Sequence, residues 1–258
     1  MTQHQLVLHT PDGRPMPAVW AYRLYAWLLT RMPREEGDWL HQTGEHPISQ
    51  FLSYDKDTQQ MVWTVNLLCT ELETRLSPPL LETNTIDLHG CPISVERQTI
   101  RKVPGPEALI FQGREQCRKR VEIRFLTPTA FKQAGRYAIF PQERLLLQSL
   151  LGRWNYLCPD YPLTDEDAIS ALLEGLHIVD YALRTTRYRM KDTAIPGFCG
   201  KIQVEAKLPL PLLELWGALV CLAPYGGIGI KTTLGMGVRR YPSKGRIRLP
   251  FDRRCPCK

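Results

Sequence analysis

Apolar and polar positions along this chain follow two different periods, and together they predict a regular succession of strands and helices. Alternation with period two predicts strands, for example around Trp63 and, most strictly, at residues 200–208. Apolar residues at helical spacing predict helices. Pro33 stops the first predicted helix. In the first hundred residues the predicted order is a strand, a helix, two strands, a helix and a last strand interrupted near Gly90, at residues 5–8, 20–32, 47–54, 60–67, 71–81 and 85–97.

The same order of elements returns in the second half of the chain. A strand, a helix, a short extra helix, two strands, a helix that opens with Pro211 and a last strand are predicted at residues 121–125, 143–156, 165–173, 177–189, 200–208, 211 onward and 237–241. Each half therefore has the β-α-β-β-α-β order of a ferredoxin-like domain, whose two helices cover one face of a four-stranded antiparallel sheet. The predicted fold class is α+β, with tandem ferredoxin-like, or RRM-like, domains.

The boundary between the two halves is expected in a segment that begins at Pro104-Gly-Pro106. Its proline and glycine content is typical of a linker. The predicted divisions are an N-terminal domain, a linker, a C-terminal domain and a basic tail, at residues 1–103, 104–119, 120–243 and 244–258.

Composition indicates a globular protein that stays in the cytoplasm. Of the 258 residues, 43% are hydrophobic and 23% are charged. No uncharged apolar run reaches the roughly 18 residues of a membrane span, and the first residues lack the charged and apolar regions of a signal peptide. Eight cysteines occur without a C-x-x-C pair. They are expected to be reduced and mostly buried thiols, and no bound metal or other cofactor is expected.

The positive charge is unevenly distributed along the chain, and its distribution indicates what kind of partner to expect. Residues 239–258 carry eight Lys or Arg against Asp252, so they hold the whole net charge of +7. Two more basic stretches lie at residues 97–120 and 184–191. Three basic stretches in a neutral background favour a polyanionic partner. The arginines expected to contribute to binding this partner are Arg184, Arg187, Arg189 and Arg239.

The densest motif is a glycine-rich loop between the last predicted helix and the last predicted strand. Five glycines fall within residues 226–237, and Lys231-Thr-Thr233 lies between them. Glycine gives access to positive φ and removes side chains that keep a ligand from the backbone, while Lys and Thr donate to phosphate oxygens. The spacing fits neither a P-loop nor a dinucleotide-binding turn. The residues expected to bind phosphate are Gly226, Gly227, Gly229, Lys231, Thr232, Thr233, Gly235 and Gly237.

This loop resembles the carboxy-terminal signature of the RAMP proteins of CRISPR systems. The segment Phe140-Pro-Gln-Glu-Arg-Leu-Leu-Leu-Gln-Ser-Leu-Leu-Gly-Arg-Trp-Asn155 resembles a helix of the CRISPR repeat-processing endoribonucleases in that superfamily. The resemblance is specific over residues 120–241. It implies the same tandem fold and a metal-independent enzyme that cuts CRISPR precursor RNA within its repeats and leaves a 5′-hydroxyl and a 2′,3′-cyclic phosphate. The implied partner is repeat RNA, as precursor and processed guide; other CRISPR effector subunits and a homodimer are left open.

The resemblance also implies which residues are catalytic. Metal-free cleavage needs a base, an acid and a cation around the phosphate, and histidine can fill the first two roles. In the family the catalytic histidine follows leucine in a loop after the first helix, and Leu40-His41 matches this pair. His46 stands where the family has a lysine, with Lys56 as the other candidate for that cation. Some members use a tyrosine on the first helix, for which Tyr25 matches by spacing and Tyr22 competes.

Two other functions remain open at this point. A non-catalytic RAMP subunit would bind guide RNA through the same loop and would need no histidine. A small-molecule enzyme acting on phosphate esters is also compatible with ferredoxin-like domains, which host unrelated chemistries.

Overall fold

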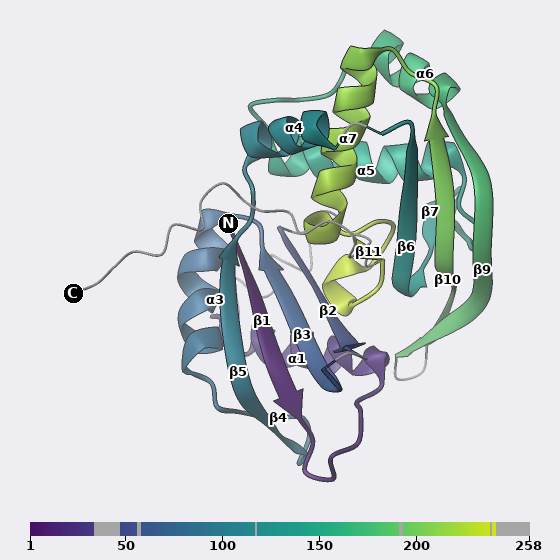
Figure 1. The fold of residues 1–258 in the computed structure, drawn as a ribbon. Helices are drawn as coiled ribbons and strands as arrows, with labels where there is room; N and C mark the ends of the chain where they lie inside the picture. The colour runs from purple at the N-terminus through teal and green to yellow at the C-terminus, as the bar shows by residue number, and fades with distance from the viewer. Residues whose placement is uncertain (34–46, 56–57, 117, 191–192, 238, 241–258) are drawn as a thin grey trace.

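The computed structural model describes residues 1–33, 47–55, 58–116, 118–190, 193–237 and 239–240. They form two α+β halves, and Figure 1 shows the N-terminal half in purple and blue beside the C-terminal half in teal to yellow. All the strand pairs in both halves of the described chain are antiparallel. The predicted α+β class is confirmed. Within these ranges, no helix is long and apolar enough to cross a membrane.

The N-terminal half follows the predicted order of elements. Its sheet has the strand order β2-β3-β1-β5-β4, so the first strand lies between the third and the last long strand, as in a ferredoxin-like domain. In chain order the elements are β1 (Thr2–His9), η1 (Ala18–Trp20), α1 (Ala21–Leu29), β2 (Ile48–Asp55), β3 (Gln60–Leu67), α3 (Thr70–Glu82), β4 (Thr85–Asp87) and β5 (Pro92–Lys102).

Strand alternation decides which face of this sheet is buried. Leu6 and Leu8 of β1 join Met61, Trp63 and Val65 of β3 in one hydrophobic cluster with the apolar residues of α1 and α3. Their neighbours along each strand point to the opposite face of the sheet. The sheet therefore has one face covered by helices and one face that is free to line a cleft.

The predicted interruption near Gly90 is a full reversal of the chain, so the single strand expected at residues 85–97 was wrong. β4 and β5 pair with each other through a two-residue turn at His89 and Gly90. Both residues have positive φ, 56° and 83°, as in a type I′ hairpin turn. The Gly90 N–H also donates to the Asp87 carboxylate at 2.8 Å, which stabilises the turn.

The C-terminal half repeats the arrangement. Its main sheet has the order β11-β6-β10-β9, which again puts the first strand beside the third and the last. A small hairpin of β7 and β8 was not predicted, because three-residue strands carry little periodicity. The elements are α4 (Pro106–Glu115), β6 (Arg120–Thr129), β7 (Phe131–Gln133), β8 (Arg136–Ala138), α5 (Glu143–Leu157), α6 (Glu166–Gly175), β9 (Leu176–Met190), β10 (Thr193–Ala206), α7 (Leu210–Gly226), η2 (Thr232–Leu234) and β11 (Arg239–Arg240).

Residues 104–119 were predicted to be a linker, but most of them form the helix α4, which packs against α7. A Cβ on Gly113 would lie 2.5 Å from the Ala218 nitrogen, and one on Gly217 would lie 2.6 Å from the Gly113 carbonyl oxygen. The two glycines thus let the helix backbones touch, and Arg114 adds an ion pair of 2.9 Å with Glu214. Gly113, which counted toward the glycine content of the predicted linker, serves helix packing instead. The domain limits at residues 103 and 120 remain a prediction.

Candidate functional site

The glycine-rich loop leaves the end of α7 and runs between the two sheets, where Figure 1 shows it in yellow. Gly227, Gly229, Gly235 and Gly237 have φ between 72° and 95°. Residues with a side chain rarely adopt these positive φ values, so the loop needs glycine at these positions for its shape. Lys231 also has a positive φ of 56°, and its side chain is exposed.

Close packing is a second reason for these glycines. A Cβ on Gly229 would clash with the Ala130 carbonyl oxygen, and one on Gly237 would clash with the Ile228 carbonyl oxygen. A Cβ on Gly235 would lie 2.5 Å from Cβ of Ala21, the first residue of α1. The glycines are therefore mostly buried against the protein itself.

Most amides of the loop are already hydrogen-bonded inside the protein. The Ile228 amide donates to the Gly237 carbonyl at 2.8 Å, the Ile230 amide to the Ala130 carbonyl at 3.0 Å, and the Gly229 amide to the Ser149 hydroxyl at 2.8 Å. The amides of residues 227 and 234–237 also have carbonyl acceptors. In the part of the chain that the structure describes, the loop amides without an acceptor are those of residues 231–233.

The hydroxyl of Thr232 was predicted to donate to a phosphate, but it is not exposed. Thr232 and Thr233 are only 3% and 5% exposed. The Thr232 Oγ1 accepts a hydrogen bond of 3.1 Å from Nη2 of Arg153 on α5. Gly226 makes room for this arginine, since a Cβ there would clash with the Arg153 stem. Arg153 was not among the predicted site residues, although it lies in the α5 segment that carried the resemblance.

Side chains of the N-terminal half hold the loop from the other side. The Ser49 hydroxyl donates to the Tyr225 carbonyl, and Nδ2 of Asn66 donates to the same carbonyl at 3.0 Å. Nε2 of Gln50 donates to the Thr233 carbonyl at 2.8 Å. The loop is thus bound to both halves of the molecule.

The structure places the predicted catalytic residues only in part. His41, His46 and Lys56 lie outside the described residues. Tyr25 is 3% exposed in the N-terminal hydrophobic cluster, and burial raises its pKa to about 12. Tyr22 is half-buried on the same helix, and its hydroxyl accepts from Nε of Arg23 at 3.2 Å.

The three arginines of β9 are exposed but do not share one face. Arg184, Arg187 and Arg189 pair in regular register with Cys199, Pro196 and Ala194 of β10. Alternation along a strand therefore puts Arg184 on the side opposite to Arg187 and Arg189. The Arg184 side is also that of Tyr188, whose hydroxyl donates to the Leu234 carbonyl in the glycine-rich loop. The backbone of Arg239 lies in β11, and its side chain lies outside the described part.

A cleft of about 680 Å³ lies between the two halves. Gln5 of β1 with Arg97 and Arg101 of β5 line it from the N-terminal sheet. Leu126 of β6 and Pro224 of α7 line it from the C-terminal half. The cleft residues of β1 and β3 alternate with the core residues of the same strands.

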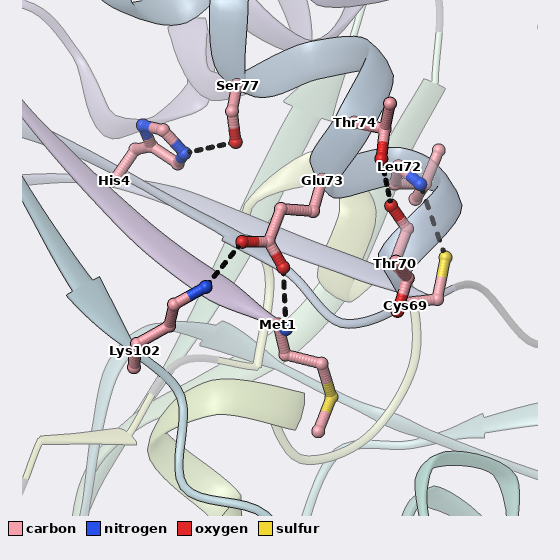
Figure 2. A network of polar contacts seen from close by, with 9 residues as sticks. All are labelled: Met1, His4, Cys69, Thr70, Leu72, Glu73, Thr74, Ser77 and Lys102. Atoms are coloured by element: carbon pink, nitrogen blue, oxygen red, sulfur yellow. Dashed lines mark hydrogen bonds and ion pairs between the residues drawn. The ribbon is translucent and has the colours of Figure 1, made fainter.

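The first basic stretch is divided between two surfaces. Whereas Arg97 and Arg101 line the cleft, Nζ of Lys102 bonds to Glu73 of α3 at 2.8 Å, and the Met1 ammonium bonds to the same carboxylate at 2.7 Å (Figure 2). The hydrogen bonds from Lys102 and from Met1 lower the pKa of Glu73. Lys102 therefore belongs to an ion-pair network, and the stretch is not one continuous basic surface.

Comparison with known proteins identifies the family. A family model described as CRISPR-associated endoribonuclease Cas6 matches residues 123–238, which include the glycine-rich loop. A CRISPR-associated endoribonuclease Cas6 of Streptococcus thermophilus is 31% identical over 218 residues, which are 84% of this chain and 89% of that protein. The chain belongs to the Cas6 family. This confirms the resemblance seen in residues 120–241.

Other Cas6 proteins match over both halves. A Cas6 endoribonuclease of Mycobacterium tuberculosis is 26% identical over 252 residues, which are 93% of this chain and 79% of that protein. A solved Cas6 product complex covers 94% of this chain and 100% of its own, with a TM-score of 0.77 and 27% identity. A Cas6 substrate mimic complex matches with a TM-score of 0.73 and 25% identity, over 93% of this chain and 98% of its own. Cas6 membership confirms the endoribonuclease prediction and decides against the non-catalytic RAMP subunit and the phosphate-ester enzyme.

Proposed function

We propose that this Cas6 protein cuts CRISPR precursor RNA within its repeats, without a metal ion, in the cytoplasm. The ribose 2′-hydroxyl attacks the adjacent phosphorus, and the bond from phosphorus to the 5′-oxygen breaks. A base takes the proton of the 2′-hydroxyl, an acid protonates the leaving 5′-oxygen, and a cation stabilises the phosphorane. The products carry a 2′,3′-cyclic phosphate and a 5′-hydroxyl.

The observation that carries the proposal is the set of three amides without an acceptor beside exposed Lys231. Consecutive backbone N–H groups form a concave anion site, and a lysine adds a point charge to it. Arg153 brings a second cation to Thr232, at the base of the same turn. RNA phosphate is therefore bound at this turn, where Lys231 is the exposed residue and Thr232 and Thr233 are nearly buried, and the glycines hold the turn in shape rather than offering their own amides.

The catalytic roles are assigned from the family resemblance. His41 is the base or the acid, and His46 or Lys56 supplies the cation. A tyrosine that contacts RNA must be accessible, and the half-buried Tyr22 meets this condition better than the buried Tyr25. Among the arginines of β9, Arg184 lies on the face that carries the loop contact and is the closest match to the predicted role.

Cleavage of the cognate repeat RNA in EDTA tests the proposal. We expect one cut within the repeat and a downstream fragment that polynucleotide kinase can phosphorylate without prior phosphatase treatment. His41→Ala should lower the single-turnover rate by roughly 10²-fold or more, as expected for loss of a general acid or base. Lys231→Ala should weaken RNA binding, whereas Lys132→Ala, at an exposed lysine of β7, should leave it unchanged. In the same series Tyr22→Phe should slow cleavage more than Tyr25→Phe.

Two results would contradict the proposal. Cleavage that appears only when Mg²⁺ is added would exclude a metal-independent mechanism. An unchanged rate in His41→Ala would place the catalytic site elsewhere in the chain.

A further inference from the structure

Gln50 is the third residue of β2, is 0% exposed, and joins three elements of the fold. Its Nε2 donates to the carbonyl of Ala21 at 2.9 Å and to the carbonyl of Thr233 at 2.8 Å. Its Oε1 accepts from Nε1 of Trp63 at 2.8 Å. An indole nitrogen can only donate and a carbonyl can only accept, so the amide has one possible orientation. Gln50 thus connects the first residue of α1 to the glycine-rich loop.

Tyr188 makes a parallel connection from the C-terminal half. Its hydroxyl is buried and donates to the carbonyl of Leu234, the loop residue after Thr233. The carbonyl oxygen of Val19, in the short helix before α1, lies 3.4 Å from the same hydroxyl. One side chain from each half therefore lies between a loop carbonyl and a carbonyl at the start of α1.

The loop and α1 also touch directly. Cβ of Ala21 is in contact with Gly235, where a Cβ would lie 2.5 Å away, and Tyr188 Oη would lie 3.2 Å from the same position. Along the chain, α1 leads to the segment of residues 34–46, which contains His41. The position of the RNA-binding turn is thus coupled to the helix from which the catalytic segment extends.

We propose that Gln50 and Tyr188 are positioning residues for RNA cleavage: they hold the phosphate-binding turn in a fixed position relative to α1. This inference rests on the proposed function. An apolar side chain in place of Gln50 would fill the same space and leave the Ala21 and Thr233 carbonyls without their donor. The turn would keep its own amides and Lys231, and would still bind RNA, but in a less defined position relative to α1.

The test separates binding from cleavage. Gln50→Met, Tyr188→Phe and the double variant are compared with the parent for the Kd of a repeat RNA with a 2′-deoxy substitution at the cut, and for the single-turnover rate at saturating protein. We expect the rate to fall by about 10- to 100-fold, because small misplacement of reacting groups has effects of this size. The Kd should stay within about threefold of the parent value, a small change in binding.

Asn155→Leu is the matched control. Its amide also bridges backbone groups, accepting from the Leu163 N–H at 2.7 Å and donating to the Leu163 carbonyl at 3.1 Å, but it joins α5 to the following loop. This variant should cleave like the parent when saturated. Tyr188→Phe removes a single oxygen and carries the test if Gln50→Met does not fold.

The outcomes are distinguishable. A parental rate at saturation in Gln50→Met and Tyr188→Phe overturns the inference, as does a loss that appears only in Kd. A rate loss of the same size in Asn155→Leu assigns the effect to general destabilisation and also overturns it. If the parent does not cut repeat RNA, or if His41→Ala cuts at the parental rate, the proposed function itself fails.

Discussion

At the scale of single residues, a buried polar side chain in this protein stabilises the fold only while its hydrogen-bond partners are present. Gln50 is fully paired, so it stabilises the contact between loop and helix. Removing one partner would leave a buried polar group unsatisfied, at a cost of about 1–3 kcal/mol. His4 on β1 is a second buried polar residue, and its partners also decide which protonation state the fold accepts.

His4 should make the fold sensitive to acid. It is 0% exposed, its Nε2 lies 2.9 Å from the Ser77 hydroxyl (Figure 2), and its Nδ1 lies 3.2 Å from Nε2 of Gln98. Burial lowers the pKa of His4 from 6.5 to about 4, against a smaller opposing effect of Glu73. Since the folded pKa lies below the unfolded one, this contribution to stability is complete above pH 6.5 and is lost as the pH falls toward 4. The total loss is about 3 kcal/mol.

Urea unfolding at several pH values between 7.5 and 4 checks this prediction. His4→Gln should remove this part of the pH dependence, whereas His177→Gln, at an exposed histidine of β9, should leave it in place. Equal slopes for the parent and His4→Gln between pH 6.5 and 4 would contradict the assignment.

At the scale of elements, the glycine-rich loop combines two demands on its glycines, positive φ and close packing. Gly135, in the turn between β7 and β8, has only the first demand: its φ is 77° and no atom lies within 4 Å of a Cβ placed there. Gly229 has a φ of 85° and a Cβ there would clash with the Ala130 carbonyl oxygen. The two glycines therefore form a matched pair that separates backbone strain from displacement of the loop.

Gly229→Ala should weaken RNA binding roughly tenfold or more, about 1.4 kcal/mol, at every salt concentration, because the turn at residues 231–233 is displaced. Gly135→Ala carries a similar strain of about 1–2 kcal/mol in stability and should bind repeat RNA like the parent. Filter binding over a range of salt concentrations, with a thermal melt of each variant, gives both values. Parental affinity in a folded Gly229→Ala protein would mean that the loop shape does not matter for RNA.

At the scale of the whole molecule, the two halves meet at the loop, while the net charge lies at the end of the chain. Residues 244–258 contain six of the basic residues and lie outside the described part. We expect the charges of this segment to raise RNA affinity by counterion release without selecting a sequence. Positioning of the cut should then depend on the loop and α1, and overall affinity on the tail.

Removing residues 244–258 should flatten the dependence of RNA binding on salt, while the cut stays at the same nucleotide. Changing the six Lys and Arg of the tail to Gln should have the same effect at full length, since the effect depends on charge. Binding isotherms at several salt concentrations and mapping of the product ends provide the measurement. An unchanged salt slope, or a shifted cut, would show that the tail has a different role.

The sequence by itself determined the repeated β-α-β-β-α-β order and the apolar faces of its strands and helices, but not α4 or the short strands β4, β7 and β8. Alternation around Trp63 and the helical spacing in α5 each arise within a few consecutive residues, so they can be read locally. The cluster of five glycines also had a correct location, between the last helix and the last strand. The type I′ turn at His89 and Gly90 was not predicted, because it requires a positive φ at His89, which a non-glycine residue seldom adopts.

Only the tertiary structure decided which groups of these elements contact and hydrogen-bond one another. Gly113 looked like part of a linker until α7 supplied Gly217 opposite it. The loop glycines looked like phosphate ligands until carbonyls and the Ser149 hydroxyl, all from the C-terminal half, occupied most of the loop amides. Gln50 and Thr233 are 183 residues apart in the chain and 2.8 Å apart in space. Periodicity is a property of neighbouring residues, whereas the partner of a buried amide depends on how distant segments pack, and no local pattern carries that information.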